Sequence, residues 1–368
     1  WVHRDAERNY AAIAAELEQI IDRSLRALAG TGTRTLRVNA APHARGDVPA
    51  LGGGAAASSV AVTPVATASG FVLENELVRV GIDADGMIAS LVDLRTGRES
   101  LPPAQRAALF QLHRDTPTQW DAWDIDEHYR RHVTDLVEAD EVKIDGDAVV
   151  VRRCFGASTL ETRFTLDAGS RTVRLAIDVD WHEQQKLLKL AVPVDVHTDQ
   201  ARSEIQFGHI VRPTHTNTSW DAARFETVAH RWVHVAEPGF GVAVVNDSTY
   251  GHDITRQPRQ DGGTSSTVRL SIIRGALFPD PQQDQGPHHL EVGIVVGADV
   301  HDAIVEGYRI NLPERVVPSS EAAQIAPIVT VSDPSVVVEA VKLAEDGSSD
   351  VIVRLYESLG RRIRTAVT

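Results

Sequence analysis

Apolar residues recur every third or fourth position at the start of the chain and every second position over much of the rest. Between residues 2 and 29 they form one helical stripe, made of Tyr10, Ile13, Ala14, Leu17, Ile20, Ile21, Leu25 and Leu28. Gly30 follows at the position of a C-cap glycine. The pattern predicts one amphipathic helix. Because a single helix cannot bury its own stripe, we expect sister helices upstream, and within this chain a stripe that stays partly uncovered or is covered by a neighbouring molecule.

Beyond Gly30 the pattern changes to short alternating runs that Gly, Asp, Asn and Pro separate, which is typical of β-strands. Many short strands with turns between them predict a large antiparallel β-sandwich in a mainly β fold. The expected strands cover residues 35–38, 60–65, 77–82, 148–155, 159–166, 172–181, 241–245, 266–273, 290–296, 336–343 and 351–356.

Two changes in composition indicate boundaries between parts of the chain. Residues 50–59 are rich in Gly, Ala and Ser and predict a flexible connector, and prolines cluster between 313 and 327. We therefore expect four parts: the last helix of a helical bundle (1–30), a small β-segment and linker (31–69), the large β-sandwich (70–315) and a smaller terminal β-region (316–368).

Composition narrows the classes of partner. The 368 residues carry 51 acidic and 37 basic side chains and a net charge of −14, which repels nucleic acid and anionic membrane surfaces. No apolar run approaches the roughly 20 residues of a membrane-spanning helix. A single cysteine, Cys154, excludes an internal disulfide and a thiolate metal cluster. The chain begins with Trp1 instead of Met, so we expect a piece of a longer protein.

Candidate binding chemistry gathers in residues 120–127, where two indoles and four carboxylates lie within eight residues. Indole rings stack on the apolar faces of sugar rings, and carboxylates accept hydrogen bonds from sugar hydroxyls. The alternative is a surface loop that Trp120 and Trp123 anchor and whose acids are solvated. A second polar stretch, residues 212–221, has no periodicity and is typical of loops that bind ligands.

No catalytic or metal-binding motif accompanies these loops. His230 and His234 lie in strand-forming sequence, where four residues span roughly 13 Å, too far for two ligands of one ion. HExxH, nucleophile-elbow, Walker and dinucleotide patterns are missing from the sequence. The residues alone predict a β-sandwich with loops that contact carbohydrate.

Several long motifs resemble the C-terminal region of glycoside hydrolase family 38 α-mannosidases, of the bacterial and cytosolic type. They are FVLENELVRV at 71–80, WDAWDID at 120–126, FGHIVRPTHTNTSWDAARFE at 207–226, residues 230–250 and RGALFPDPQQDQG at 274–286. The helix at 2–29 resembles the family's helical bundle just after its last zinc-ligand histidine, and residues 336–356 resemble its terminal β-region. The resemblance implies a galactose mutarotase-like supersandwich as the large β-domain.

The same resemblance implies a retaining, zinc-dependent hydrolase of terminal α-mannosides. The family's nucleophile and zinc ligands lie upstream of the residues present here, so we expect no catalytic residue and no metal ligand in this chain, and no activity of the chain alone. Arg274 resembles a sugar-contacting arginine. The loop with Trp123, Asp121 and Asp124 resembles a segment at the edge of the substrate pocket.

The expected partners are a terminal α-mannoside together with an N-terminal catalytic domain, and the expected location is the bacterial cytoplasm. Two further classes stay open. One is a self-standing carbohydrate-binding module, and the other is a structural β-domain that forms homo-oligomers. The unpaired bundle helix favours the mannosidase, because a free-standing module would not begin with it.

Overall fold

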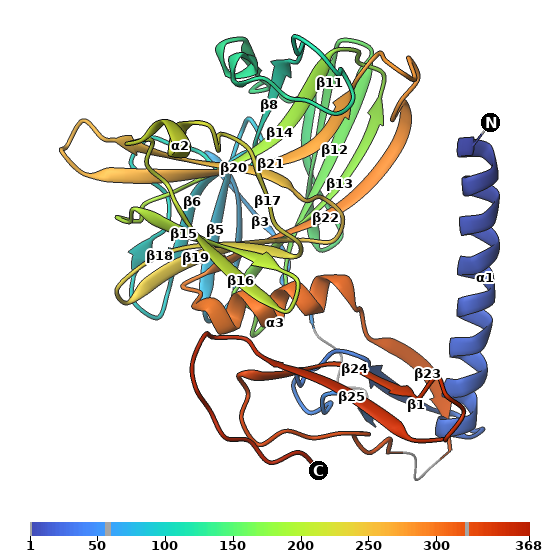
Figure 1. Ribbon diagram of the computed structural model, residues 1–368. Coiled ribbons are helices and arrows are strands. Elements are labelled where there is room, and N and C mark those ends of the chain that lie inside the picture. Colours follow the sequence, from blue (N-terminus) through green and yellow to red (C-terminus); the bar gives the residue numbers. More distant parts are fainter. Residues whose placement is uncertain (1, 56–59, 321–323) are drawn as a thin grey trace. The chain divides into compact units, whose positions relative to one another are not determined.

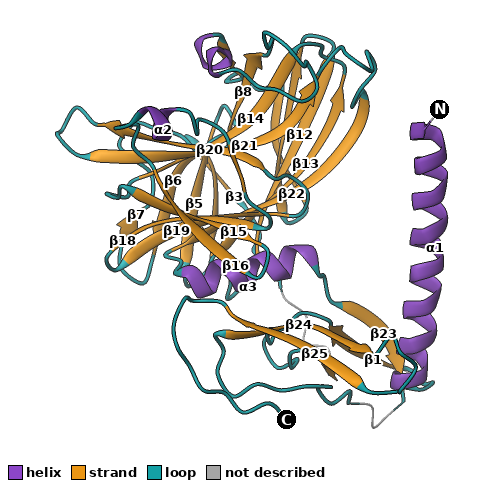
Figure 2. Ribbon diagram, in the orientation of Figure 1, coloured by secondary structure: helices purple, strands orange, loops and turns teal. Residues whose placement is uncertain are grey.

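The computed structural model describes residues 2–55, 60–320 and 324–368, which form two compact units. The larger unit comprises Ser59–Asn311 and Ser358–Gly360, and the smaller one comprises Trp1–Ser58, Leu312–Glu357 and Arg361–Thr368. Strands make up most of the regular structure in both units (Figures 1 and 2), so the predicted mainly β fold is confirmed. No helix among the described residues combines the length and the apolar character that crossing a membrane requires.

Three antiparallel sheets build the larger unit. The nine-stranded sheet has the order β10 (Glu141–Asp145), β11 (Ala148–Phe155), β12 (Ser158–Leu166), β13 (Thr172–Trp181), β22 (Gly286–Val296), β19 (Phe240–Asn246), β18 (Trp232–Glu237), β15 (Gln200–Ile205) and β16 (Gly208–Pro213). The six-stranded sheet has the order β17 (Thr227–Val228), β20 (Gly251–Pro258), β21 (Thr264–Gly275), β14 (Lys186–Val194), β8 (Leu109–Arg114) and β9 (Val133–Asp135). The five-stranded sheet has the order β3 (Val65–Thr67), β4 (Gly70–Glu74), β5 (Val78–Asp83), β6 (Ile88–Asp93) and β7 (Arg98–Glu99).

Short helices complete this unit: the 3-10 helix η1 (Glu127–Arg131), the single turn α2 (Ser219–Ala222) and α3 (Val300–Asn311). The hydrophobic core draws on all three sheets, with Leu91 from β6, Leu190 from β14 and Phe164 from β12 among its buried residues. In β12 buried residues alternate with more exposed ones, as a sheet with one covered face requires, whereas β19 is buried throughout. Because the sheets share one core, the prediction of a large antiparallel sandwich is confirmed.

The smaller unit contains α1 (Val2–Ala29), a three-stranded sheet and a hairpin. The sheet has the order β2 (Gly52–Ala55), β1 (Arg34–Asn39) and β23 (Arg315–Ser319), and the hairpin joins β24 (Val336–Leu343) to β25 (Val351–Glu357). β1 pairs with β23 from Arg34↔Ser319 to Val38↔Arg315. β1 and β2, from the part predicted at 31–69, therefore share one sheet with β23, most of which lies in the part predicted at 316–368.

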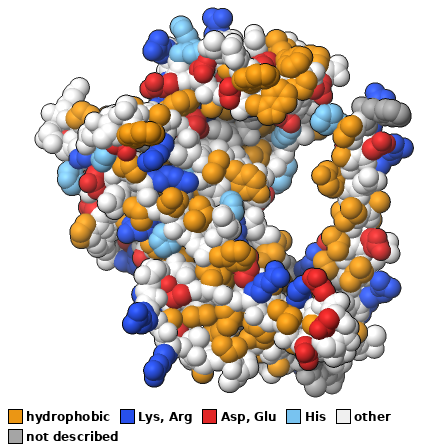
Figure 3. Space-filling model, viewed as in Figure 1, with side chains coloured by type: hydrophobic (Ala, Val, Ile, Leu, Met, Phe, Trp, Pro, Cys, Tyr) orange, Lys and Arg blue, Asp and Glu red, His pale blue; other side chains and the backbone are white. Residues whose placement is uncertain are grey.

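The apolar stripe of α1 is largely uncovered. Tyr10 is 71% exposed and Leu17 52% exposed, whereas Leu25 and Ala29 alone are buried along the helix. Figure 3 shows hydrophobic side chains on the surface along this helix. The prediction of a partly uncovered stripe is confirmed for this chain.

Candidate functional site

Arg274 lies near the end of β21, opposite Leu187 of β14. Its guanidinium donates through Nε to the Asp115 carboxylate, through Nη2 to the carbonyl of Asp124, and through Nη1 to the carbonyl of Ala122 at 3.4 Å. The rigid end of a long strand thus holds both a buried acid and the loop at 120–126. The predicted strand end and the predicted loop come together, although about 150 residues separate them in sequence.

The loop at 120–126 also holds itself in place. Trp120 has a positive φ of 56°, and its carbonyl accepts hydrogen bonds from the backbone nitrogens of Trp123 at 2.7 Å and Asp124 at 2.8 Å. Asp121 accepts from the backbone nitrogens of Leu277 at 2.7 Å and Phe278 at 3.0 Å. Asp121 therefore joins the loop to the segment that follows Arg274, which is a structural task.

The remaining predicted binding groups point outward from this loop. The Trp123 side chain is 66% exposed, that of Trp120 is 64% exposed, and Asp124 is exposed. Two accessible indoles and one accessible carboxylate are therefore presented beside Arg274. This arrangement suits the stacking and hydrogen bonding that a sugar ring offers.

Asp115 was not among the sequence candidates, yet it anchors Arg274. Its side chain is 2% exposed, and burial raises the pKa of Asp115 above its ordinary value although the Arg274 guanidinium lowers it. The backbone nitrogen of Asp115 also donates to the carbonyl of Gln185 at 2.9 Å. No local pattern in the sequence identifies Asp115, because its partner lies 159 residues away.

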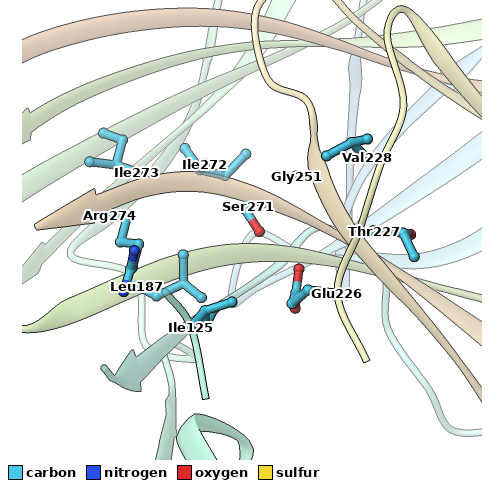
Figure 4. Close-up of a pocket in the computed structure, with 10 residues that line it drawn as sticks. All are labelled: Ile125, Leu187, Glu226, Thr227, Val228, Gly251, Ser271, Ile272, Ile273 and Arg274. Atoms are coloured by element: carbon cyan, nitrogen blue, oxygen red, sulfur yellow. The ribbon is translucent and has the colours of Figure 1, made fainter. Parts of the chain in front are cut away.

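A cavity of about 300 Å³ opens beside Arg274 (Figure 4). Apolar side chains form most of its wall, and the polar groups are contributed by Glu226, Thr227, Ser271 and Arg274. The lining residues are Ile125, Leu187, Glu226, Thr227, Val228, Gly251, Ser271, Ile272, Ile273 and Arg274. Figure 4 shows the oxygens of Ser271 and Glu226 pointing toward one another. An apolar wall with a few polar groups is the usual form of a small-molecule pocket.

Glu226 connects this cavity to a buried cluster of charges around Lys189. The Lys189 side chain is fully buried; its ammonium contacts the carboxylate of Glu226 and lies 2.6 Å from Asp253 Oδ2 and 3.2 Å from the hydroxyl of Tyr129. Arg269 lies 3.0 Å from the other oxygen of Asp253. This cluster was not predicted from the sequence, although a lysine inside the apolar run of β14 indicates a buried cation that needs an acidic partner.

The pKa values of the two acids in this cluster are shifted in opposite directions. Burial raises the pKa of Glu226, and the Lys189 ammonium only partly opposes this effect. Burial also favours the neutral form of Asp253, but Lys189, Arg269 and Arg130 together hold the pKa of Asp253 below its ordinary value. The charged form of Asp253 is therefore favoured, whereas the neutral form of Glu226 is favoured relative to an exposed glutamate.

His230 and His234 do not form a metal site together. His234 is buried in β18 and its Nε2 lies 2.9 Å from the carbonyl of Ala298, whereas His230 is exposed. Among the described residues, no group of three or more His, Cys, Asp or Glu side chains is placed to hold a metal ion. The zinc that the resemblance implies has no fitting set of ligands in this part of the chain.

The family model that matches this chain is the glycosyl hydrolases family 38 C-terminal domain, over residues 73–282. The chain belongs to this family. Alpha-mannosidase 2C1 of Homo sapiens is 36% identical over 305 residues, which are 79% of this chain and 28% of that protein. Alpha-mannosidase G of Dictyostelium discoideum is 30% identical over 318 residues, 80% of this chain and 28% of that protein.

The fold of this chain is also similar to that of a solved structure. The crystal structure of an alpha-mannosidase from Enterococcus faecalis matches with a TM-score of 0.64 at 16% identity, covering 85% of this chain and 39% of that protein. The family 38 chain described here thus spans about three tenths of the length of its curated relatives. Both Arg274 and the loop at 120–126 lie inside the matched family region.

Proposed function

We propose that this chain is part of an α-mannosidase that hydrolyses terminal α-D-mannosyl residues by a retaining, zinc-dependent mechanism, and that it forms one edge of the substrate pocket. One observation carries the proposal: Arg274 fixes a loop that presents two exposed indoles beside a cavity. The matches to family 38 and to proteins named alpha-mannosidases support the substrate class.

Each residue has a separate task in this proposal. Trp123 stacks on the apolar face of a pyranose ring, and the exposed carboxylate of Asp124 accepts from sugar hydroxyls. Arg274 keeps the loop in place, since all three of its nitrogens already have acceptors. Asp121 holds the loop against residues 277–278. The sugar contact of Arg274 itself, which the resemblance implies, would be made from the wall of the cavity that Arg274 helps to line.

The bond-breaking groups lie outside this chain in the proposal. A retaining glycosidase needs two carboxyl groups roughly 5 Å apart that flank the scissile bond. In this proposal both carboxyl groups come from the N-terminal catalytic domain, and so do the zinc ligands, since the described residues offer no fitting ligand set. We expect the isolated chain to leave an aryl α-mannoside intact and to bind no stoichiometric zinc. A cytoplasmic location is part of the same proposal.

The test uses the intact enzyme and an aryl α-mannoside. Trp123→Ala should lower kcat/KM about tenfold, or about 1.4 kcal/mol, with little change in melting temperature, because the indole is exposed. Trp220→Ala, at a residue that lies outside the loop and is 77% exposed, is the matched control and should leave the kinetics unchanged. Unchanged kinetics in Trp123→Ala would remove this loop from the pocket edge.

The role of Arg274 needs its own pair of variants. Arg274→Ala should lower kcat/KM by roughly ten- to a thousandfold and should also lower the melting temperature, because it leaves Asp115 buried without its cation. Arg274→Lys keeps that charge but cannot reach the loop carbonyls in the same planar geometry. We expect the lysine variant to recover stability more than activity. Recovery of both together would mean that charge alone is required.

The exposed indoles also favour a second candidate, a self-standing carbohydrate-binding module. Binding of the isolated chain to a glycan array, in the absence of any hydrolytic domain, would support this alternative. The pocket-edge proposal instead expects weak or no binding by the isolated chain, since half of the pocket would be missing.

A further inference from the structure

A second, smaller pocket lies at the polar stretch that the sequence analysis singled out at 212–221. It is formed by the end of β16, the residues around α2 and the neighbouring strands β15, β17 and β20, and its volume is about 30 Å³. A volume of this size exceeds the roughly 10–15 Å³ that one water needs, and it suits a small polar group. Two arginines, Arg212 and Arg224, contribute to its wall.

Arg212 is the unusual member of this pocket. Its Nη1 is shielded from solvent and has no hydrogen-bond partner among the described residues, while the residue as a whole is half-buried. Burial and the neighbouring Arg224 both lower the pKa of Arg212, so both oppose its charge. Buried donors in native proteins almost always have partners, and the unpartnered Nη1 of Arg212 therefore points to a missing acceptor.

The other polar groups of the pocket do not supply that acceptor. His252 Nε2 lies 3.2 Å from Ser203 Oγ and 3.1 Å from Thr227 Oγ1, and burial lowers the pKa of His252 to about 4, so it is neutral near pH 7. Asp221 is the one carboxylate in the wall. One of its oxygens already accepts from the hydroxyl of Thr218 at 2.7 Å and from the Thr218 backbone nitrogen at 3.2 Å.

Charge decides what this pocket attracts. Two guanidinium cations face one carboxylate and a neutral imidazole, so the wall carries a net positive charge although the whole chain is at −14. Guanidinium groups bind planar or tetrahedral oxyanions through pairs of parallel hydrogen bonds. Ser203 and Thr227, whose hydroxyls contact His252 Nε2, lie in the same wall, as does Thr214, whose hydroxyl donates to the carbonyl of Thr198 at 3.4 Å.

We propose that Arg212 and Arg224 form a binding site for an oxyanion, a phosphate, sulfate or carboxylate group. Thr227 lines both this pocket and the cavity of Figure 4, so the two are neighbours that share a wall. The anion is either free in solution or the charged group of a sugar derivative whose neutral part occupies the cavity. The site rests on Arg212 and its surroundings and stands whether or not the protein is a mannosidase.

The experiment is calorimetric titration of the intact protein with inorganic phosphate at low ionic strength. We expect a dissociation constant on the order of 0.1–10 mM, which corresponds to a single charge-assisted site. Arg212→Met keeps the aliphatic stem and should weaken binding at least about tenfold, and Arg224→Met should weaken it several-fold. Arg114→Met, at an exposed arginine of the same unit, is the matched control and should bind as the wild type does.

A stability measurement excludes misfolding as the cause of lost binding. Without phosphate, Arg212→Met should melt at the wild-type temperature or above it, because it removes a buried nitrogen that has no hydrogen-bond partner among the described residues. Phosphate should then raise the melting temperature of the wild type but not that of the variant. Equal phosphate affinity in wild type and Arg212→Met, or no phosphate binding by the wild type, would overturn the proposal.

A further titration identifies the source of the anion. Mannose 6-phosphate should bind at least about tenfold more tightly than inorganic phosphate if the charged group belongs to a sugar, and equally if the anion is free. In both cases Arg212→Met must lose the interaction. A crystal structure grown in phosphate that contains only water between Arg212 and Arg224 would also refute the site.

Discussion

Lys189 offers the sharpest test of how the core beneath the cavity is stabilised. Replacing it with methionine keeps most of the side-chain volume but removes the ammonium that contacts Glu226 and Asp253. Asp253 keeps Arg269 and Arg130 as partners, whereas Glu226 loses the one cation that contacts it among the described residues. Because a buried carboxylate is then left without its counter-charge, we expect a loss of about 3–5 kcal/mol of folding free energy.

The loss should appear as a lower melting temperature. For domains of 150–250 residues, each kcal/mol shifts the melting temperature by about 2–4 °C, so we expect a decrease on the order of 6–20 °C in scanning calorimetry of the 368-residue chain. Lys189→Met combined with Glu226→Gln removes the unpaired acid as well. This double variant should recover a large part of the loss, and the difference from additivity measures the Lys189–Glu226 coupling.

The effect should also depend on pH. Because burial raises the pKa of Glu226 above 4.5, the folded protein binds a proton at pH values where the unfolded chain has already lost it. Stability therefore falls as pH rises from 4.5 through the folded pKa, and removing Lys189 extends this window upward. Lys189→Met should be more destabilising at pH 8 than at pH 5. A pH-independent loss, or a double variant no more stable than the single one, would refute the reasoning.

Three other expectations concern the surface, the helix and the buried histidines. Asp124→Asn in the intact enzyme should raise KM for an aryl mannoside several-fold with no change in melting temperature, whereas Asp121→Asn should mainly lower the melting temperature, because Asp121 holds the backbone at 277–278. Leu17→Glu in the uncovered stripe of α1 should reduce self-association of the isolated chain in sedimentation velocity without loss of helix, and unchanged association would show that another surface is responsible. Burial lowers the pKa of His113 and of His252 to about 4, so the unfolded chain takes up protons first and stability falls as pH drops from 6.5 toward 4, by up to about 1.4 kcal/mol per pH unit for each histidine. His252→Gln should make the melting temperature less dependent on pH in that range, and an unaltered slope would contradict this account.

Local patterns were sufficient for the elements and for some of the turns. The three- and four-residue repeat predicted the helix up to its C-cap at Gly30, and α1 ends at Ala29. The runs at 172–181 and 336–343 match β13 and β24. Gly86 and Gly169, which separate alternating runs in the sequence, adopt positive φ values of 74° and 72° in the turns between β5 and β6 and between β12 and β13. Each of these features depends on residues within a few positions of one another, so the chain need not be folded to predict them.

The candidate site was predictable only in part. The residue types in 120–127 pointed to sugar binding without a fold, and Arg274 came from a motif resemblance. Neither the residue types nor the motif predicted that Arg274 contacts this loop. The contact depends on the pairing register of β21 and β14, which places Arg274 next to Asp115 and the loop. The sequence predicted Asp121 as a binding group, and the fold adds a second contact: its Oδ2 accepts from the backbone nitrogens of Leu277 and Phe278.

The sequence by itself therefore determined the periodicities, the turns, the charge and the family motifs, all of which are properties of neighbouring residues. Tertiary structure alone decided which distant side chains meet and which are buried. Lys189 is an ordinary lysine in the sequence, but in the fold it is a fully buried cation between Glu226 and Asp253. Arg212 likewise has a hidden, unpartnered nitrogen only because strands from several parts of the chain close around it. Desolvation and ion pairing depend on what surrounds a group in space, and for that reason the chemistry of both sites was settled by the packing of the sheets.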